Sequence, residues 1–478
     1  MKRIIFILLS VVVSFGLPAA ELKPTGPQSD GAFRKVILDA DEEVDGVMHD
    51  TVVDPMELAV AKDGRVFYAQ RDGTVKMWRP ETKKTVVIGK IAVFTGLEDG
   101  LLGVALDPNF LKNGWVYFYH SLPQTGMDHN GEKVGTNELS RFTVTGDTLD
   151  LQSEKKLIDV RTQREQCCHS GGSVAFDKVG NIYVSAGDNT NPFASDSYSP
   201  VDEQPGRSPW DAQKSAANAN DLRGKILRVH PEKNGTYTIP KGNLFPPGTK
   251  GTRPEIYIMG DRNPFRIAID QKNGFLYWGE VGPDANEANA TRGPAGLDEI
   301  NQARKAGNFG WPYFIGENKP YWHWDFANKT NDYLNDPAHP VNHSPNNTGI
   351  TNLPPAQPSF IAYPYGASTH FPLVGSGGRT AMAGPVYYFD KKLKSPHKLP
   401  IEFDHTLFIY EWSRNWIIAV HLDKDDRIAK MEKFCEHMKF LRPMDMELGP
   451  DGCLYLIEFG SAWGNNKDTQ IERIEYAP

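Results

Sequence analysis

The segment MELAVAKDGRVFYAQ, residues 56–70, contains the pattern that decides the fold. An apolar strand is followed by a turn built on Asp and Gly, and then by a second strand that opens with an aromatic residue. The pattern recurs in GVALDPNFLKNGWVYFYHS (103–121), GGSVAFDKVGNIYVSAG (171–187), FRIAIDQKNGFLYWGEVG (265–282) and MDMELGPDGCLYLIEFG (444–460). Each copy is a hairpin that cannot bury both faces alone, so we expect sheets packed radially about an axis.

A weaker sixth copy, FDHTLFIYEWSRNWIIAVHLD (403–423), has lost the turn glycine. Six copies predict an all-β fold, a six-bladed β-propeller with long loop insertions at residues 189–220 and 312–379. The best helix signal is LDEINQARKAGNFGW (297–311), which predicts one or two helical turns ended by glycines.

The composition excludes several classes of protein. The chain has 478 residues and a formal net charge of −8, and it has no Lys/Arg run that would follow a phosphate backbone, so no nucleic acid is expected as a partner. Walker A, His-Glu-x-x-His and Gly-x-Ser-x-Gly motifs are also missing. GSGG at residues 375–378 is not a dinucleotide fingerprint, so NAD-dependent, ATP-dependent and zinc-protease functions lose support.

The N-terminus, residues 1–20, has a basic start, an apolar run and small residues at its end, which is typical of a secretory signal peptide. The apolar run is short for a membrane anchor, so we expect a periplasmic or secreted protein with no stable membrane insertion. Residues 21–478 are expected to form a single catalytic propeller domain. In an oxidising compartment Cys435 and Cys453 could staple the last blade, and Cys167 and Cys168 could form a vicinal disulfide.

Six motifs occur in a fixed order along the chain: LEDGLLGVALDPNF (97–110), CCHSGGSVAFDKVGNIYVSAGDN (167–189), LRGKILRV (222–229), GDRNPFRIAID (260–270), GEVGPD (279–284) and GNFGWP (307–312). With these motifs the chain resembles the soluble glucose and sorbosone dehydrogenases that depend on pyrroloquinoline quinone (PQQ). That family includes bacterial aldose dehydrogenases and fungal pyranose dehydrogenases. The resemblance implies a six-bladed propeller with PQQ over the axial opening and Ca²⁺ bridging cofactor and protein.

The resemblance implies catalytic roles for three residues. His169 matches the family's general base and Asp188 the carboxylate that orients it, while Arg262, with Asn263, matches the pair that touches the quinone. An imidazole suits removal of a hydroxyl proton because its pKa lies near 6.5. From the residues alone, however, a histidine beside two glycines is more often structural, and Arg262 could equally form a salt bridge at the rim.

The resemblance also implies partners for the three carboxylates of PQQ. Arg442 matches one family cation, and Arg414 stands where the glucose dehydrogenases have a lysine. A further family arginine aligns with Met444, so we hypothesise that Arg379 or Arg207 compensates. Glu98 stands where those enzymes have a glutamine that contacts substrate, which makes glucose doubtful as the substrate.

For calcium, Gly282 and Pro283 match the family's backbone-carbonyl ligands, which suit a hard cation. Asp298 and Glu299 match acidic positions that serve a second calcium. Acidic residues at a predicted helix start are also an ordinary response to the helix dipole, and both interpretations stay open.

The sequence thus predicts a PQQ- and calcium-dependent oxidation of a sugar or polyol, with electrons passed to an external acceptor such as a cytochrome or quinone. Two alternatives remain: a calcium-dependent propeller hydrolase or lactonase, and a non-catalytic carbohydrate-binding propeller.

Overall fold

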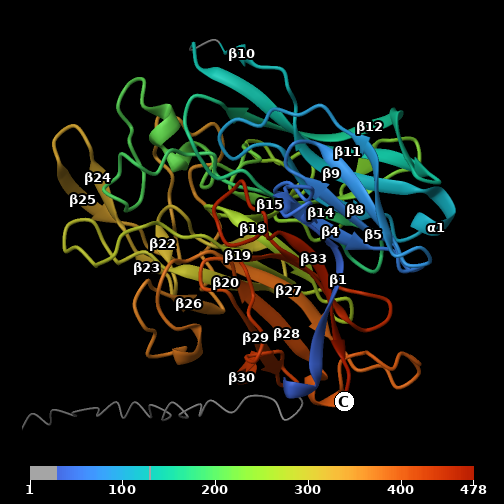
Figure 1. Cartoon of the computed structure of the whole chain (residues 1–478). Helices are drawn as coiled ribbons and strands as arrows, with labels where there is room; N and C mark the ends of the chain where they lie inside the picture. Colours follow the sequence, from blue (N-terminus) through green and yellow to red (C-terminus); the bar gives the residue numbers. More distant parts are fainter. Residues whose placement is uncertain (1–29, 129–130) are drawn as a thin grey trace, which may run out of the picture.

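The computed structural model describes residues 30–128 and 131–478. The predicted signal peptide lies outside them. The described chain forms six antiparallel sheets of four principal strands, arranged as blades around one axis (Figure 1). The six innermost strands contact one another in a closed ring, so the predicted six-bladed β-propeller is confirmed.

The first three blades follow the chain order. Blade 1 comprises β4 (Pro55–Val60), β5 (Val66–Gln70), β6 (Thr74–Arg79) and β7 (Lys84–Lys90). Blade 2 comprises β8 (Leu101–Leu106), β9 (Trp115–Ser121), β11 (Lys133–Thr145) and β12 (Thr148–Gln163), with β10 (Gly126–Met127) at its edge. Blade 3 comprises β13 (Gly171–Phe176), β14 (Ile182–Ala186), β15 (Lys225–Pro231) and β17 (Ile256–Met259), extended by β16 (Tyr237–Thr238) and β21 (Gly307–Asn308).

The last three blades complete the ring. Blade 4 comprises β18 (Pro264–Ile269), β19 (Leu276–Glu280), β20 (Asp298–Ala303) and β26 (Ile361–Tyr363). Blade 5 comprises β27 (Ala381–Tyr387), β28 (Thr406–Glu411), β29 (Trp416–Leu422) and β30 (Ile428–Phe434). Blade 6 comprises β31 (Pro443–Leu448), β32 (Leu454–Glu458), β33 (Gln470–Tyr476) and, from the other end of the chain, β1 (Phe33–Ala40).

Short elements fill the connections between blades. They are the hairpins β2 (Glu42–Val44) with β3 (Val47–His49), β22 (Phe314–Ile315) with β23 (Lys319–Pro320), and β24 (Trp322–Asp325) with β25 (Thr330–Leu334), the helix α1 (Phe110–Asn113), and the 3-10 turns η1 (Asp30–Ala32), η2 (Ser208–Trp210), η3 (Ala212–Lys214), η4 (Pro372–Val374) and η5 (Ile401–Phe403). Within the described residues no helix has the length and apolar character needed to cross a membrane.

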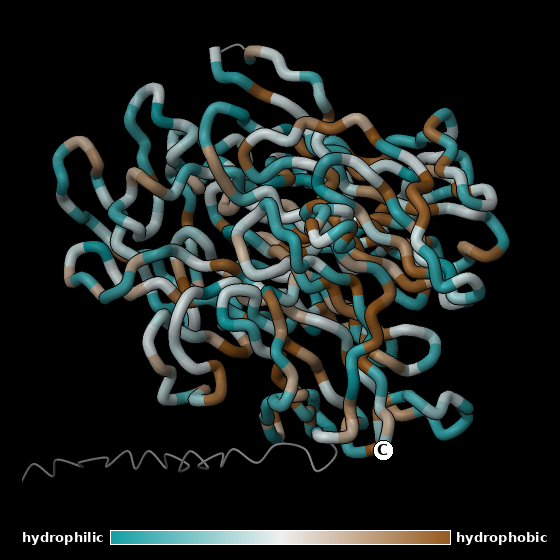
Figure 2. The backbone as a smooth tube through the Cα atoms, viewed as in Figure 1, coloured by the Kyte–Doolittle hydropathy of each residue, from teal (hydrophilic) through white to brown (hydrophobic). Residues whose placement is uncertain are grey.

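The core lies between neighbouring blades. The strands carry most of the hydrophobic residues, and the peripheral loops are largely hydrophilic (Figure 2). Every inner strand has a register shift against the second strand of its blade, and in all of them except β27 the shift lies near the end where the inner strand begins. A shift of this kind is a β-bulge, which leaves a residue unpaired and re-aims its side chain.

Three sequence expectations were wrong. Residues 298–303 form the strand β20 rather than a helix, because the segment is buried on both faces as the third strand of blade 4. The sixth repeat is displaced by one strand: residues 403–423 contain β28 and β29, whereas the inner hairpin is β27 with β28, separated by a connection of 18 residues, 388–405. Cys435 and Cys453 are separate buried thiols.

The closure of blade 6 gives a first prediction. Phe33 on β1 is 4% exposed and its ring packs against Phe434 and Tyr476. Phe33→Ala should lower the free energy of unfolding by about 3–5 kcal/mol because it leaves a cavity at the seam. The matched control is Ile37→Ala on the same strand, where the side chain is 48% exposed and the loss should be below about 1 kcal/mol. Equal losses in denaturant unfolding would contradict a closure that depends on this seam.

Candidate functional site

A cavity of about 630 Å³ opens at the end of the propeller axis where the six inner strands begin. We call it the axial cavity. Every inner strand, or the segment just before it, contributes to its lining, through Met56, Glu98, His169, Asn263, Thr380 and Met444. Functional side chains gather here because strands that converge on an axis bring distant segments of sequence together.

His169 and Asp188 form a buried pair at this cavity. Nδ1 of His169 lies 2.7 Å from Oδ1 of Asp188, and the two side chains are 4% and 0% exposed. Oδ2 of Asp188 accepts a hydrogen bond of 2.7 Å from Nε1 of Trp311. A carboxylate held on both oxygens fixes the orientation of the imidazole and keeps the proton on Nδ1. Nε2 of His169 is then the ring nitrogen that can take up a proton.

Trp311 was not predicted as a functional residue, although its motif GNFGWP was recognised. Its indole reaches Asp188 from the long connection between β20 and β26 of blade 4, whereas His169 and Asp188 both belong to blade 3. Trp311 stands 123 positions from Asp188, and a separation of that length leaves no spacing signal in the sequence. Only the order of the family motifs could have suggested it.

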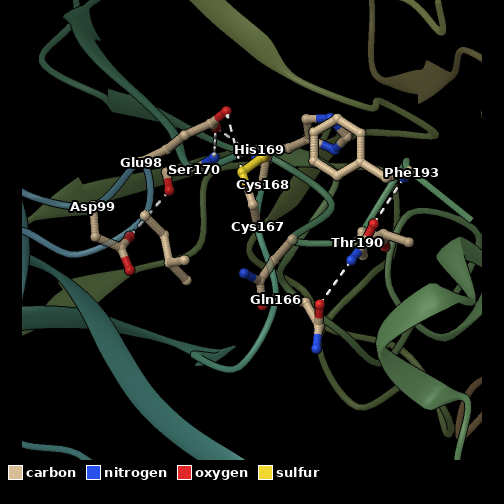
Figure 3. The surroundings of a disulfide bond; sticks show 12 residues. Glu98, Asp99, Gln166, Cys167, Cys168, His169, Ser170, Thr190 and Phe193 are labelled. Carbon is tan, nitrogen blue, oxygen red and sulfur yellow. Dashed lines mark hydrogen bonds between the residues drawn. A yellow bond between two sulfur atoms is a disulfide. The ribbon is translucent and has the colours of Figure 1, made fainter.

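Glu98 holds the backbone that carries His169. Its Oε2 accepts hydrogen bonds from the N–H of His169 at 2.6 Å and of Ser170 at 3.3 Å (Figure 3). His169 has a φ of +70°, a conformation that costs energy for a residue with a Cβ and persists only when its surroundings impose it. Cys167 and Cys168, directly before His169, form a disulfide, so the vicinal bond considered from the sequence is present. Glu98 and this disulfide together constrain the turn.

Arg262 and Asn263 approach the same cavity from the start of β18. The N–H groups of both residues donate to Oε1 of Glu280, and Nη1 of Arg262 donates to the carbonyl of Val281 at 2.8 Å. Oδ1 of Asn263 accepts from the N–H of Gly171 at 3.1 Å. These bonds tie the arginine to the turn that carries His169.

Arg379 supplies a second cation to the axial cavity. Its guanidinium stacks 3.8 Å from the ring centre of Tyr365, and its Nη2 donates to the carbonyl of Pro283 at 2.7 Å. Nε and Nη1 are buried and have no hydrogen-bond acceptor among the described residues, although Nη1 lies 3.5 Å from Oδ1 of Asp298. Buried donors of this kind call for a negatively charged ligand.

The other predicted cations do not themselves line the axial cavity, although Arg414 and Arg442 contact residues that do. Arg414 donates to backbone carbonyls of the segment before β27, including that of Gly378 at 2.7 Å. Arg442 stacks over the rings of Trp412 and Trp463. Arg207 stacks on a tryptophan and pairs with an aspartate in the 189–220 insertion. Their roles as cofactor contacts stay predictions, and the structure favours Arg379.

A second, smaller cavity lies beside the axial one and is rich in oxygen atoms. Gly282 and Pro283 line it, together with Asp261, Glu280, Glu299 and Asn301. Among the described residues, both carboxylate oxygens of Asp261, Oε2 of Glu280 and Oδ1 of Asn301 are buried without a hydrogen-bond partner. We call it the acidic cavity.

The pKa values of its carboxyl groups show the cost of this burial. Burial, with Asp261 and Glu299 nearby, raises the pKa of Glu280 well above its usual range. Burial also raises the pKa of Asp261 far above normal and that of Glu299 to about 7. A bound cation would remove this cost, because it favours the ionised forms.

Asp298 and Glu299 thus differ in their surroundings. Glu299 lines the acidic cavity, whereas both oxygens of Asp298 accept backbone hydrogen bonds, from Gly282 at 3.1 Å and Ala381 at 3.0 Å. The role of Asp298 as a metal ligand therefore stays a prediction. Asp261 and Asn301 were not predicted, since neither stands in an acidic run.

Comparisons with known proteins agree with this architecture. A family model described as Glucose / Sorbosone dehydrogenase matches residues 52–355. Quinoprotein glucose dehydrogenase B of Acinetobacter calcoaceticus is 23% identical, over 87% of this chain and 84% of its own length. Aldose sugar dehydrogenase YliI of Escherichia coli is 24% identical, over 86% of this chain and 88% of its own length.

Solved structures share the fold. The soluble aldose sugar dehydrogenase from Escherichia coli superposes with a TM-score of 0.59 at 18% identity, covering 93% of this chain and 99% of its own. The PQQ-bound form of the aldose sugar dehydrogenase from Streptomyces coelicolor gives a TM-score of 0.54 at 17% identity, covering 95% and 99%.

A different type of relative matches part of the chain. The human Hedgehog-interacting protein is 25% identical over 43% of this chain, which is 28% of its own length. The resemblance inferred from the motifs is nevertheless confirmed, because the family model spans more than half of the sequence. This protein belongs to the glucose / sorbosone dehydrogenase family.

Proposed function

We propose that this protein is an exported sugar dehydrogenase that uses PQQ and calcium, with His169 as its general base. The observation that carries the proposal is the His169–Asp188–Trp311 chain of hydrogen bonds, which ends at a cavity with an arginine-rich wall. The PQQ-bound relative from Streptomyces coelicolor supports the choice of cofactor.

The residues of the axial cavity fit an anionic quinone. Arg262 and Arg379 would hold it, because Arg379 has buried donors without acceptors among the described residues, and a carboxylate ligand would satisfy them. When bound, PQQ would supply the quinone group that accepts a hydride from the substrate.

The protein supplies the proton chemistry. Nε2 of His169 would take the proton from the substrate hydroxyl as hydride leaves the same carbon, so that the alcohol becomes a carbonyl. Asp188 would stabilise the positive charge that forms on the ring. Arg262 would stabilise the negative charge that develops on the acceptor. The rim of the cavity adds two exposed aromatic side chains, Phe193 and Trp463, that suit the flat apolar faces of a sugar.

Calcium would bind at the acidic cavity, where Gly282 and Pro283 would offer their carbonyl oxygens beside the carboxylates of Asp261, Glu280 and Glu299. When bound, the ion would supply Lewis-acid chemistry at the side of the axial cavity to which Arg262 also contributes. The unpartnered oxygens of the acidic cavity are hard donors of the type that Ca²⁺ prefers.

The alternative functions have less support. A metal-dependent hydrolase would need carboxylates converging on a metal in the open axial cavity, but they converge on the separate acidic cavity instead. A binding propeller, which the Hedgehog-interacting relative suggests, has no need of an oriented histidine. We expect the electron acceptor to be a separate cytochrome or quinone.

Reconstitution tests the proposal directly. The purified mature protein, loaded with PQQ and Ca²⁺, should show the absorbance of a bound quinone and should reduce an artificial electron acceptor with at least one aldose or polyol. Saturable quinone binding without turnover on any sugar would favour the non-catalytic propeller, and the absence of quinone binding would contradict the dehydrogenase.

His169→Ala tests the base. The variant should keep its affinity for PQQ and its melting temperature, while kcat falls by roughly 10²–10⁴-fold because proton removal is lost. His339→Ala is the matched control. This histidine lies in the 312–379 insertion, is 85% exposed and does not line the axial cavity. Loss of PQQ binding together with activity would assign His169 a structural role instead.

Calcium addition tests the acidic cavity. At a calcium concentration 100 times Kd, binding should stabilise the apoprotein by about 2.7 kcal/mol and raise its melting temperature. Asp261→Asn should abolish most of this rise, because it removes a charged oxygen ligand from the cavity. The exposed Glu317→Gln serves as control. An undiminished response in Asp261→Asn would place the ion elsewhere.

A further inference from the structure

The floor of the axial cavity is formed by residues of three inner strands. Met56, Phe265 and Met444 line the cavity, and each lies at the register shift of its strand, β4, β18 and β31 respectively. A bulge residue has no partner in the strand ladder, so its carbonyl must find a donor elsewhere. We call these three residues the axial floor.

One side chain satisfies all three carbonyls. Arg266 donates from Nε to the carbonyl of Met444 at 3.1 Å, from Nη1 to that of Phe265 at 2.9 Å, and from Nη2 to that of Met56. Arg266 is 1% exposed and ranks among the largest fully buried side chains of the described residues. The planar, five-donor guanidinium suits this task, which an ammonium group cannot reproduce.

Arg266 lies in a buried charged layer with Glu57 and Asp445, the residues that follow Met56 and Met444. Oδ1 of Asp445 is 3.6 Å from Nε of Arg266, and the other oxygen of Asp445 accepts from the N–H of Leu58 at 2.8 Å. Glu57 accepts hydrogen bonds from Ser173 and the N–H of Val104.

A second hollow of about 260 Å³ lies further along the same six strands and is lined mainly by apolar residues such as Val60, Phe176, Ile269 and Leu448. Arg266, Glu57 and Asp445 are each 5% exposed or less, so their charges act in a medium of lower dielectric constant than water.

We propose that Arg266 is a positioning residue of the axial cavity: it holds the floor of the quinone site rigid and places a permanent positive charge beneath it, which raises the reduction potential of the bound cofactor. This inference rests on the proposed function. Reduction adds negative charge to a quinone, and a fixed cation that needs no reorganisation stabilises that charge.

Two substitutions separate the effect of the hydrogen bonds to the three carbonyls from the effect of the positive charge. Arg266→Lys keeps the charge but cannot reach three carbonyls, so we expect quinone binding at least tenfold weaker and an almost unchanged midpoint potential. Arg266→Met loses both. Its midpoint potential should fall by about 30 mV or more, which is a tenfold change in the ratio of oxidised to reduced cofactor. The readouts are a quinone titration and spectroelectrochemistry of the bound cofactor.

A third substitution should shift the midpoint potential in the opposite direction. The Arg266 guanidinium, 3.6 Å from Oδ1 of Asp445, favours the ionised form of this carboxyl group. Asp445→Asn then removes a negative charge, keeps an acceptor oxygen and should raise the midpoint potential at pH 8. A purely structural role for the cluster does not produce shifts of opposite sign, and this arm remains informative if Arg266→Met fails to fold.

Arg141→Met is the matched control. Arg141 is 4% exposed and donates to two backbone carbonyls, those of Glu232 at 2.9 Å and Lys233 at 3.0 Å, away from the axis. The control should lose thermal stability but keep the wild-type potential and quinone affinity. If the midpoint potentials of Arg266→Met and Asp445→Asn are unchanged, or shift in the same direction, the inference about Arg266 is wrong, while the proposed function is unaffected. Absence of quinone binding by the wild type would contradict the proposed function itself.

Discussion

The pairing of β1 with β33 is the interaction on which the rest of the structure depends, because it joins the two ends of the described chain in one sheet and closes the ring. An open ring would leave an unpaired edge and would let the blades separate. Closure forces six inner strands to converge on one axis, and this convergence gathers His169, Arg262 and Arg379 from three blades. The candidate site is therefore a consequence of ring geometry rather than of any single motif.

Convergence also concentrates buried charge, and the molecule compensates for it in different ways. Asp188 is satisfied by His169 and Trp311, and Arg266 by three backbone carbonyls. The acidic cavity is different, because Asp261 and Glu280 keep oxygens without hydrogen-bond partners among the described residues. Buried charges that are fully paired support a structure, whereas unpaired ones indicate where a ligand binds.

The β-bulges link the convergence of the inner strands to the compensation of buried charge. The inner strands β4, β18 and β31 each give up one ladder position near the cavity, which turns side chains toward the axis and frees backbone carbonyls. Arg266 recovers the lost hydrogen bonds and adds charge to the floor. The turn at His169 follows the same logic, because Glu98 accepts the N–H groups of His169 and Ser170, and a disulfide precedes them. Departures from regular structure thus occur where the protein positions its functional groups.

The sequence by itself determined the blade number, five of the six inner hairpins and the candidate base, because period-two strands with Asp-Gly turns and ordered motifs are local signals. It predicted His169, Asp188, Arg262 and Asn263 as neighbours of one site. It could not distinguish Arg379 from Arg414, or separate Asp298 from Glu299, since these choices depend on which carbonyls and N–H groups lie nearby after folding. The helix expected at 298–303 is a strand, because a place inside blade 4 outweighs local propensity. Trp311, Asp261 and Arg266 acquire their contacts only when distant blades meet, and only the tertiary structure decided their roles.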